Sequence, residues 1–556
     1  MTELLVVMVA ALVVIAAAAV TGPRLGIAAP LVLVAIGVGT SFLPVFAAAQ
    51  IKPEWILEGV LPPLLYSSAV SMPAMNFRRE FGAISGLSVV LVIGSALLLG
   101  LFFSRVVPGL GFAWGVALGA IVSPTDAVAT SIIKQTSVSR RVVAMLDGES
   151  LLNDATALVL LRTAAIAATA LSFSFWGALG SFAYSVAVAA VLGWAAGTLN
   201  LLVRKRITDP AVNTVISFAV PFVASVPAEL LGASGLVAAV VAGLVTGVLA
   251  ARSLSPQNRL SDSQNWGTVE LVLEGVVFLT MGVQIKSIVT SVERDHAGVG
   301  PAVLIAAGAL VLTVLVRAAY VAPLLGGLAV RGRRSERMRA RMQDMQERLT
   351  TPEGRQEAYL EVNPRARREA SERTLDRFAF RVTQSVADLE YFLRAPLGWR
   401  EGTAVVWAGM RGAVTVAAAQ TLPEDTPQRS VLVLVAFTVA TLSLVVQGGT
   451  IGPLLRRIAP KVDPVAVAAQ TEAEQTKIAE LLKTSTATVP EPPALDPTPD
   501  SFRVAKAHRL AVLEVQRSAL LDARDHGTFD AELLERALAN LDASQIAIEM
   551  RGSVAV

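Results

Sequence analysis

Long apolar runs separated by short polar breaks dominate the chain from residue 3 to about 328 and return from about 397 to 457. Most of these runs reach the roughly 20 residues that an α-helix needs to cross a hydrocarbon core about 30 Å thick. The pattern therefore predicts an all-α, polytopic membrane protein with about thirteen transmembrane helices. The predicted spans are residues 3–20, 26–46, 52–70, 80–105, 111–133, 142–170, 176–203, 211–226, 233–250, 267–286, 300–328, 397–421 and 430–457.

The composition agrees with this interpretation. Hydrophobic residues make up 54% of the chain and charged residues only 16%, against about 25% charged residues in soluble domains. A soluble protein could not bury so many apolar runs. No Lys or Arg precedes the first run, "LLVVMVAALVVIAAAAV", and a signal peptide normally begins with a basic segment. We therefore expect the first run to be a spanning helix.

The basic residues of the short loops predict the orientation. Loops on the cytoplasmic side of a membrane protein carry an excess of Lys and Arg. The even-numbered short loops hold five such residues, Lys52, Arg105, Lys286, Arg294 and Arg429. The odd-numbered loops hold eleven: Arg24, Arg78, Arg79, Lys134, Arg140, Arg141, Arg204, Lys205, Arg206, Arg252 and Arg259. This bias places the N-terminus outside the cell and the C-terminus in the cytoplasm.

Two polar segments fall on the predicted cytoplasmic side. We expect a transmembrane domain over residues 1–460, with a cytoplasmic insert at 331–395 that holds 15 Arg, no Lys and 11 acidic residues. Within it, "SERMRARMQDMQERL" predicts a solvated, ion-paired helix, and binding of lipid headgroups or regulation remains an alternative role. Residues 461–556 should form a cytoplasmic tail with amphipathic helices after the Pro-rich break "PEPPALDPTPD".

The sixth predicted span begins with polar residues that a membrane helix should avoid. A charged side chain at the bilayer centre costs about 2.5–3.5 kcal/mol on insertion scales. Helical spacing puts Glu149, Ser150, Asn153 and Asp154 within an arc of about 140°. A cluster at the helix end would explain Asp147 but not Asp154, which lies well inside the run. Intramembrane carboxylates usually mark ion or proton pathways, so we expect Asp154 to be functional.

Other titratable chemistry is scarce in the predicted membrane part. The chain has no Cys, and its three His, at positions 296, 508 and 526, fall in predicted loops or the tail. Thiolate sites, disulfides and histidine-based zinc sites within the membrane are therefore excluded. Carboxylates remain as the groups that could carry a proton.

The fifth span contains the sequence "GAIVSPTDAVATSII". Pro124 lacks an amide hydrogen and disfavours a helical conformation at Ser123, and Thr125 and Asp126 prefer helix caps to helix interiors. We expect the helix to break there, with a simple proline kink as the alternative. Unwound backbone at membrane depth is tolerated only where it is buried in protein or lines a cavity.

The twelfth span shows a second interruption in "WAGMRGAVTVAAA", where Gly409, Arg411 and Gly412 break the apolar run. The two interrupted spans are the fifth and the twelfth, an offset of seven spans. This offset is typical of a transporter built from two inverted six-helix repeats. Asp126 could then neutralise the N-termini of the half-helices, and Arg411 their C-termini. Arg317 and Glu274 are further charges in apolar runs that need partners.

The motifs "SPTDAVAT", "GESLLNDATALV" and "MRGAVTVAAA" resemble, in this order and spacing, the cation:proton antiporter-1 family, which includes bacterial sodium/proton antiporters and animal sodium/proton exchangers. The resemblance covers roughly residues 1–457. It implies a homodimer in the lipid bilayer of the bacterial cell membrane, whose thirteen-helix protomers each move a core domain past a dimerisation domain.

The resemblance also implies a site. The residue matching Asp154 should hold Na⁺, helped by Glu149, Ser150 and the backbone of Thr125, and Asn153 matches the amide that precedes the essential aspartate. Glu149 is expected to pair with Arg317, and Asp126 to lie near Arg411. The chain departs from the pattern in the third span, where Ser67 and Ser68 stand at positions at which some relatives carry an acid.

These residues support a hypothesis of cation/proton antiport. Na⁺ and Li⁺ prefer oxygen ligands, and burial disfavours the charged form of a carboxylate, so a proton can compete with a cation for Asp154. Because Asn153 does not titrate, we expect electroneutral exchange by alternating access, with no cofactor beyond the transported ions and no nucleic-acid partner.

Three other functions were weighed against this hypothesis. A K⁺/H⁺ antiporter would use the same chemistry. An ion-binding membrane sensor would signal through its tail. An intramembrane aspartyl protease using Asp126 and Asp154 would carry a Gly-x-Gly-Asp signature, which neither residue has.

Overall fold

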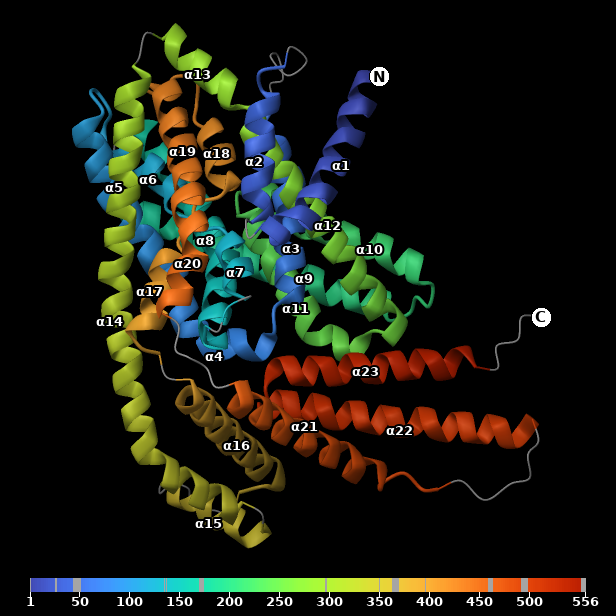
Figure 1. The fold of residues 1–556 in the computed structure, drawn as a ribbon. Coiled ribbons are helices and arrows are strands. Elements are labelled where there is room, and N and C mark those ends of the chain that lie inside the picture. The colour runs from blue at the N-terminus through green and yellow to red at the C-terminus, as the bar shows by residue number, and fades with distance from the viewer. Residues whose placement is uncertain are drawn as a thin grey trace. The chain divides into compact units, whose positions relative to one another are not determined.

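The computed structural model describes residues 2–25, 28–43, 52–134, 136, 138–169, 175–295, 298–349, 351–362, 370–395, 397–458, 464–491 and 499–551. All regular elements in these residues are helices, as the apolar pattern predicts (Figure 1). The chain divides into two units. The first comprises Met1–Ser253, Ser261–Leu324 and Trp399–Pro460, and the second comprises Leu254–Leu260, Leu325–Gly398 and Lys461–Val556.

The first unit contains most of the long apolar helices. Its helices are α1 (Thr2–Leu25), α2 (Ala29–Thr40), α3 (Leu61–Ser71), α4 (Ala74–Ser85), α5 (Val92–Val106), α6 (Phe112–Val122), α7 (Val128–Ile133), α8 (Arg140–Thr169), α9 (Phe175–Arg204), α10 (Pro210–Leu230), α11 (Gly235–Ser253), most of α12 (Pro256–Val283), α13 (Ile285–Arg294), the first half of α14 (Val299–Arg348), α17 (Trp399–Trp407), α18 (Ala413–Gln420), α19 (Arg429–Ser443) and α20 (Gly449–Ile458). Three π-helical segments continue these helices, η2 (Trp55–Val60), η3 (Gly86–Leu91) and η4 (Leu444–Gly448).

Nine helical stretches in the described part of the chain are long and apolar enough to cross a membrane. The other four predicted spans fall on shorter or interrupted helices, namely α2, η2 with α3, α6 with α7, and α17 with α18. The count of thirteen spans and the inverted repeat therefore remain predictions.

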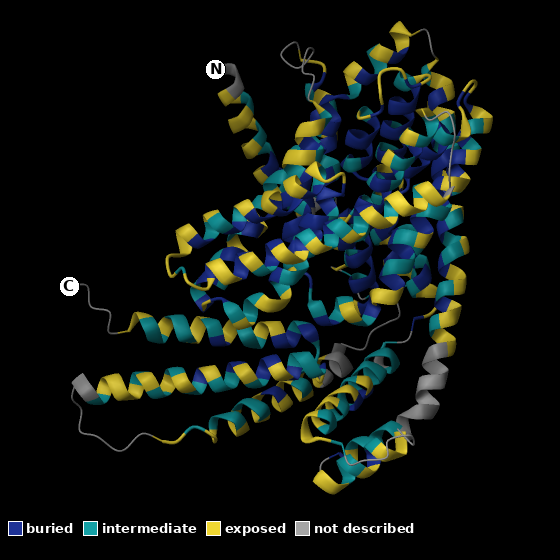
Figure 2. Ribbon diagram, turned by 180° about the vertical axis from the view of Figure 1, so that it is seen from behind, coloured by how far each residue is buried: buried dark blue, intermediate teal, exposed yellow. Residues whose placement is uncertain are grey.

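Peripheral helices of this unit expose large apolar side chains, as helices in contact with lipid do. Val13 on α1, Val215 on α10 and Leu304 on α14 are 61%, 69% and 75% exposed. Buried residues gather where the helices meet (Figure 2). In water this distribution would leave much apolar surface unburied, which supports a membrane location for the unit.

Close packing of α5 on α6 fixes the position of the interrupted span. A Cβ atom added to Gly119 would collide with the carbonyl oxygen of Ala96, and one added to Gly115 with that of Gly100. The glycines therefore let the two backbones touch. This contact holds the C-terminal end of α6, where the helix breaks, against a continuous helix.

Two arginines that the loop count treated as cytoplasmic loop residues are buried in the structure. Arg141, near the start of α8, donates to Glu80 at 2.6 Å. Arg204, at the end of α9, has no exposed surface. The remaining basic residues still favour the odd-numbered loops, so the predicted orientation does not depend on these two.

Arg204 is the centre of a buried polar cluster that joins three helices. Its guanidinium donates to Asp262 Oδ2 at 2.5 Å, to Asn213 Oδ1 at 2.7 Å and to Ser217 Oγ at 3.3 Å. Trp266 Nε1 also donates to Ser217, at 2.9 Å. These bonds link the end of α9 to α10 and α12.

The second unit is helical, as predicted for the tail. It contains the end of α14, α15 (Pro352–Val362), α16 (Glu372–Arg394), α21 (Pro464–Thr486), α22 (Pro499–His526) and α23 (Ala531–Met550). Leu520 and Leu534 lie in the apolar core of α21, α22 and α23. Asp542 on α23 accepts from Arg517 at 3.0 Å and pairs with Arg259 of the segment Leu254–Leu260.

The predicted helix in the insert is present as the end of α14, which runs without a break to Arg348. Arg348 pairs with Asp344 one turn earlier at 2.8 Å, in agreement with the predicted ion-paired surface. The side chains of residues 331–341, which include the first Arg-rich part of the insert, lie outside the described set.

Replacing Arg204 with Ala should destabilise the protein, because it leaves the buried carboxylate of Asp262 without its cation. Removing one partner of a buried pair costs about 3–5 kcal/mol. We expect a lower Tm in detergent, and recovery of part of the loss in Arg204→Ala combined with Asp262→Asn. Lys205→Ala, at the exposed neighbouring position, should melt like the wild type. A wild-type Tm for Arg204→Ala would contradict a structural role of the cluster.

Candidate functional site

The predicted break in the fifth span is present. α6 ends at Val122 and α7 begins at Val128, so the segment around Pro124 is not helical. Ser123 Oγ donates to the carbonyl of Val92 on α5 at 3.3 Å, which ties the first residue of the break to a neighbouring helix.

The predicted break in the twelfth span is also present, between the end of α17 at Trp407 and the start of α18 at Ala413. Its two glycines leave room for charged side chains from other parts of the chain. A Cβ on Gly409 would lie 2.7 Å from Cδ of Arg317, and a Cβ on Gly412 would overlap the carboxylate of Asp126. Side chains at these positions would displace the charges that surround the break.

The two breaks cross, and charged side chains of the breaks face the helix ends there. The amide of Asp126 donates to the carbonyl of Met410 at 2.7 Å. Arg411 Nε donates to the carbonyl of Val122 at the C-terminal end of α6 at 3.0 Å, and Asp126 Oδ1 accepts from the amide of Val128 at the start of α7 at 3.3 Å. A cation thus faces a helix C-terminus and an anion a helix N-terminus, as the helix dipole favours.

Two polar residues of the last span support the second break, and the sequence analysis missed them. Ser443 Oγ accepts from the amide of Arg411 at 2.9 Å and donates to Gln447 Oε1 at 2.6 Å. Gln447 Nε2 then donates to the carbonyl of Trp407 at 3.2 Å. The signal was available, because Ser443 and Gln447 stand one turn apart in the apolar stretch "LSLVVQGG".

Glu149 and Arg317 form a buried ion pair, the pairing that the family resemblance implies. Arg317 Nη2 donates to Glu149 Oε2 at 2.7 Å and Nη1 contacts Oε1, and both side chains are 2% exposed. Arg317 Nε donates to the carbonyl of Val405 in the last turn of α17 at 2.8 Å. Thr125 Oγ1 donates to Glu149 Oε1 at 3.0 Å, so this pair joins both broken helices.

Asn153 holds the unwound segment from α8. Its Nδ2 donates to the carbonyl of Thr125 at 2.9 Å and to Thr125 Oγ1 at 2.7 Å. Asn153 Oδ1 is buried and has no hydrogen-bond partner in the described part of the chain. A buried acceptor without a donor is costly. The Asn153 oxygen therefore has the capacity to accept a hydrogen bond or to contact a cation.

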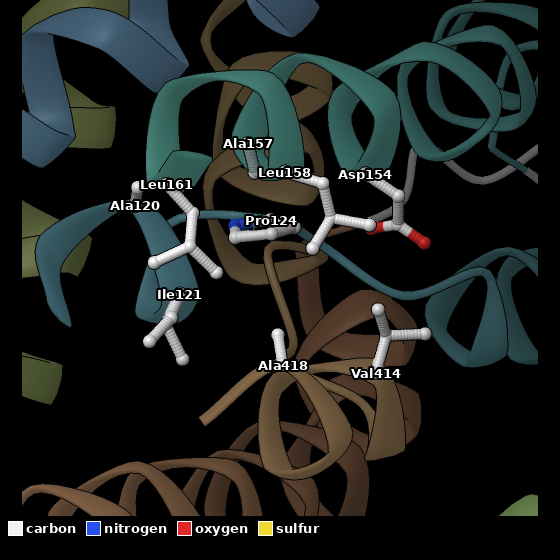
Figure 3. A pocket seen from close by; sticks show the side chains of 9 residues that line it. All are labelled: Ala120, Ile121, Pro124, Asp154, Ala157, Leu158, Leu161, Val414 and Ala418. Atoms are coloured by element: carbon white, nitrogen blue, oxygen red, sulfur yellow. The ribbon is translucent and has the colours of Figure 1, made fainter. Parts of the chain in front are cut away.

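Asp154 differs from the other acidic residues at the crossing. Within the described residues its carboxylate makes no hydrogen bond or ion pair, and its charged neighbour is another acid, Asp126. It lies at one end of a cavity (Figure 3) whose other lining residues are apolar: Ala120, Ile121, Pro124, Ala157, Leu158, Leu161, Val414 and Ala418. The half-helix α18 therefore faces Asp154 across an apolar space.

The structure does not bring every predicted residue to this point. Ser150 Oγ donates to the carbonyl of Asp147 on its own helix at 3.1 Å, and the Asp147 carboxylate pairs with Lys134 at 3.1 Å. Ser150 shares a helix face with Asp154 but is bonded away from it. Asp147 belongs to the helix end, as its position in the sequence suggested.

Glu274 on α12 has acidic neighbours instead of the partner that was expected. It interacts electrostatically with Asp126 and with Glu270. Glu270 was not singled out in the sequence, and it accepts a hydrogen bond from Ser67 on α3 at 3.0 Å. Ser68 donates within its own helix, to Leu64 at 3.2 Å. The acidic side chain beside Ser67 is thus supplied by α12.

Comparison with known proteins identifies the family. A family model described as "Sodium/hydrogen exchanger, transmembrane" matches residues 8–342 and 378–457. The chain belongs to this family.

Several relatives support the assignment. An uncharacterised Na⁺/H⁺ exchanger of Mycobacterium tuberculosis is 26% identical over 98% of this chain and 96% of its own length. The uncharacterised Na⁺/H⁺ exchanger YjcE of Escherichia coli is 34% identical over 47% of this chain and 49% of its own. The sodium, potassium, lithium and rubidium/H⁺ antiporter of Bacillus subtilis is 28% identical over 48% of this chain and 41% of its own.

A solved structure shares the fold. The sodium proton antiporter MjNhaP1 of Methanocaldococcus jannaschii aligns over 82% of this chain and 100% of its own with a TM-score of 0.55, at 15% identity. As a member of the sodium/hydrogen exchanger family, this protein is a multi-pass membrane protein and a secondary transporter, not an enzyme. Family membership also rejects the aspartyl protease alternative.

Replacing Arg317 with Ala should lower the yield of folded exchanger, because Glu149 and the carbonyl of Val405 both lose their buried donor. We expect most of the protein to elute as aggregate in size-exclusion chromatography. Arg317→Ala combined with Glu149→Gln removes the orphaned charge and should recover part of the folded peak. If Arg317→Ala eluted as a wild-type monodisperse peak, the pair would not be structural.

Proposed function

We propose that this exchanger moves one monovalent cation against one proton, with the two ions competing for Asp154. The observation that carries the proposal is the pairing pattern at the crossing. Glu149 is paired with Arg317, while Arg411 and Asp126 are bonded to helix ends. Asp154 alone among these five charged residues has no bonded partner within the described part of the chain. Only a mobile ion could then satisfy its charge.

The competition follows from the surroundings of Asp154. An isolated carboxylate in an apolar cavity is destabilised unless it binds a cation or a proton. We propose that the cation is held by Asp154, Glu149, Ser150 and the carbonyl of Thr125. The unpartnered Oδ1 of Asn153 supports this arrangement as a nearby oxygen. In alternating access, the site opens to one side of the membrane and then to the other. If it changes sides only with a cation or a proton bound, each cycle exchanges one ion for the other.

The stoichiometry follows from the residue before Asp154. A second titratable acid there would bring a second proton into the cycle, but Asn153 carries no charge in either state and is bonded to Thr125. We infer that one proton exchanges for one monovalent cation and that transport is electroneutral.

Na⁺ and Li⁺ are the proposed substrates, and K⁺ is the second candidate. The Bacillus subtilis relative, whose printed name includes potassium and rubidium, keeps the second candidate open. A membrane sensor that signals through its tail is an alternative from a different functional class. The apolar core formed by the tail helices supports it. Cation-dependent flux in a protein truncated after residue 460 would reject the sensor.

We further propose that the exchanger is a homodimer in the bacterial cell membrane, with its N-terminus outside and its C-terminus in the cytoplasm. The loop charges support the orientation. Apolar side chains exposed on α1 and α10, such as Val13 and Val215, offer surface that lipid or a second copy would cover.

Asp154→Asn should leave a folded protein without exchange, because the amide cannot alternate between a charged and a protonated form. We would reconstitute the wild type and the variant in liposomes with an imposed pH gradient, add Na⁺, Li⁺ or K⁺ separately, and follow an internal pH dye. The cation that collapses the gradient only with the wild type is the substrate. The exposed loop variant Asp425→Asn should behave as wild type. Normal exchange by well-folded Asp154→Asn would end the proposal.

Transport should be insensitive to membrane potential. In liposomes whose potential is clamped at different values with K⁺ and valinomycin, the initial rate of Na⁺-driven pH change should stay the same, because no net charge crosses per cycle. A rate that rises or falls steadily with the imposed potential would show unequal charge exchange and overturn the one-to-one stoichiometry.

A further inference from the structure

A stripe of residues with different chemistry at its two ends runs along α12 to Gln284, the residue between α12 and α13. The amide of Gln284 donates to the carbonyl of Thr280 at 3.2 Å, so helical spacing extends to it. With 3.6 residues per turn, Glu270, Glu274 and Gln284 fall within an arc of about 80°, and Val277 and Met281 lie inside the same arc. Val277 and Met281 are buried. Acidic residues thus occupy one half of the stripe, apolar residues follow, and an amide ends it.

The two acidic residues of the stripe interact with charges at the crossing and at one end of the bundle. Glu274 interacts electrostatically with Asp126, and Glu270 with Lys134 and Asp147. Because α12 rises about 1.5 Å per residue, Gln284 lies about 21 Å further along the helix than Glu270. The amide therefore stands at the opposite end of the bundle from Lys134.

A hydrogen bond between two amide side chains joins α12 to the half-helix beside Asp154. Gln420 Nε2 donates to Gln284 Oε1 at 2.5 Å. Gln420 is the last residue of α18, whose Val414 and Ala418 line the cavity at Asp154. Gln284 is 4% exposed. The bond therefore lies where a path from the cavity toward α13 would have to open.

The end of α18 is fixed independently of this bond. Arg429 on α19 donates to the carbonyl of Gln420 and to that of Leu422, both at 2.7 Å. The side chain of Gln420 is therefore left to reach across to α12. Breaking its bond to Gln284 would leave the end of α18 attached to α19.

A second contact at the same end is weaker. Arg162 on α8 pairs with Glu229 on α10 at 2.8 Å, but the two side chains are 58% and 36% exposed. Exposed ion pairs contribute little. The buried amide pair is therefore the stronger of these two contacts.

We propose that Gln284 and Gln420 form a latch that closes the ion path on the side of α13 and opens each time Asp154 faces that side. This inference rests on the proposed antiport by alternating access. A single neutral hydrogen bond is weak enough to break in every cycle. Gln284 Nε2 is buried and unpartnered within the described residues, so water reaching it in the open state would offset part of the lost bond.

The absence of cysteine from the chain makes a cross-linking test direct. Gln284→Cys combined with Gln420→Cys is bridged with a short, reducible bis-methanethiosulfonate, and cation-dependent proton flux is measured before bridging, after bridging and after reduction. We expect bridging to abolish flux and reduction to restore it. Both single-cysteine variants, and the double variant treated with a monofunctional reagent, should keep their flux. Full flux in the bridged protein, or failure of reagents of two lengths to bridge the pair, would overturn the latch.

A second measurement does not depend on transport. Ala418→Cys reports access to the cavity through its rate of labelling by an impermeant maleimide applied to one face of the membrane at a time. Adding Gln284→Ala and Gln420→Ala should raise the rate from the α13 side about fivefold, the effect of losing one neutral hydrogen bond. An unchanged rate from that side would overturn the latch. A wild type without cation-dependent flux would instead end the antiport proposal, so the two proposals can fail separately.

Discussion

The crossing of the two interrupted helices is the constraint from which the rest of the site follows. Backbone groups freed within a membrane have no water to bond and must be satisfied inside the protein. Here the bond from Asp126 to Met410 joins the breaks directly, and Arg411 covers the carbonyl of Val122. The freed backbone groups of the second break also need partners. Ser443 accepts from the amide of Arg411 and Gln447 donates to the carbonyl of Trp407, which explains why these two polar residues occur in a largely apolar helix.

Pairing distinguishes Asp154 from the other charged residues inside this bundle. Arg141 with Glu80, Arg204 with Asp262 and Arg317 with Glu149 are buried pairs, and each joins different helices, so each holds geometry. Losing one member of such a pair is far more damaging than the pair is stabilising. Asp154 is half-buried among apolar side chains without such a partner, a cost that persists only where the charge has a use.

Local signals in the sequence were sufficient to predict the two breaks and to single out Asp154 as a candidate, because proline, glycine and charge interrupt apolar runs at Pro124, Gly409 and Asp154. Pairings between distant residues were not readable from residues alone. The hydrogen bond between Ser67 and Glu270 joins residues 203 positions apart in the sequence, and no pattern along the chain predicts it. Arg204 was misread for a related reason, since a basic residue at a helix end looks like a loop residue until the fold supplies Asp262.

The different chemistry of the two ends of α12 has a physical logic. A carboxylate at the closing end would attract the transported cation and change its charge with pH, so that the closed state would depend on the ions being exchanged. Amide side chains do not titrate and hold monovalent cations weakly. A latch of Gln284 and Gln420 would therefore open and close with the position of the core alone. The choice between proton and cation is then left to Asp154.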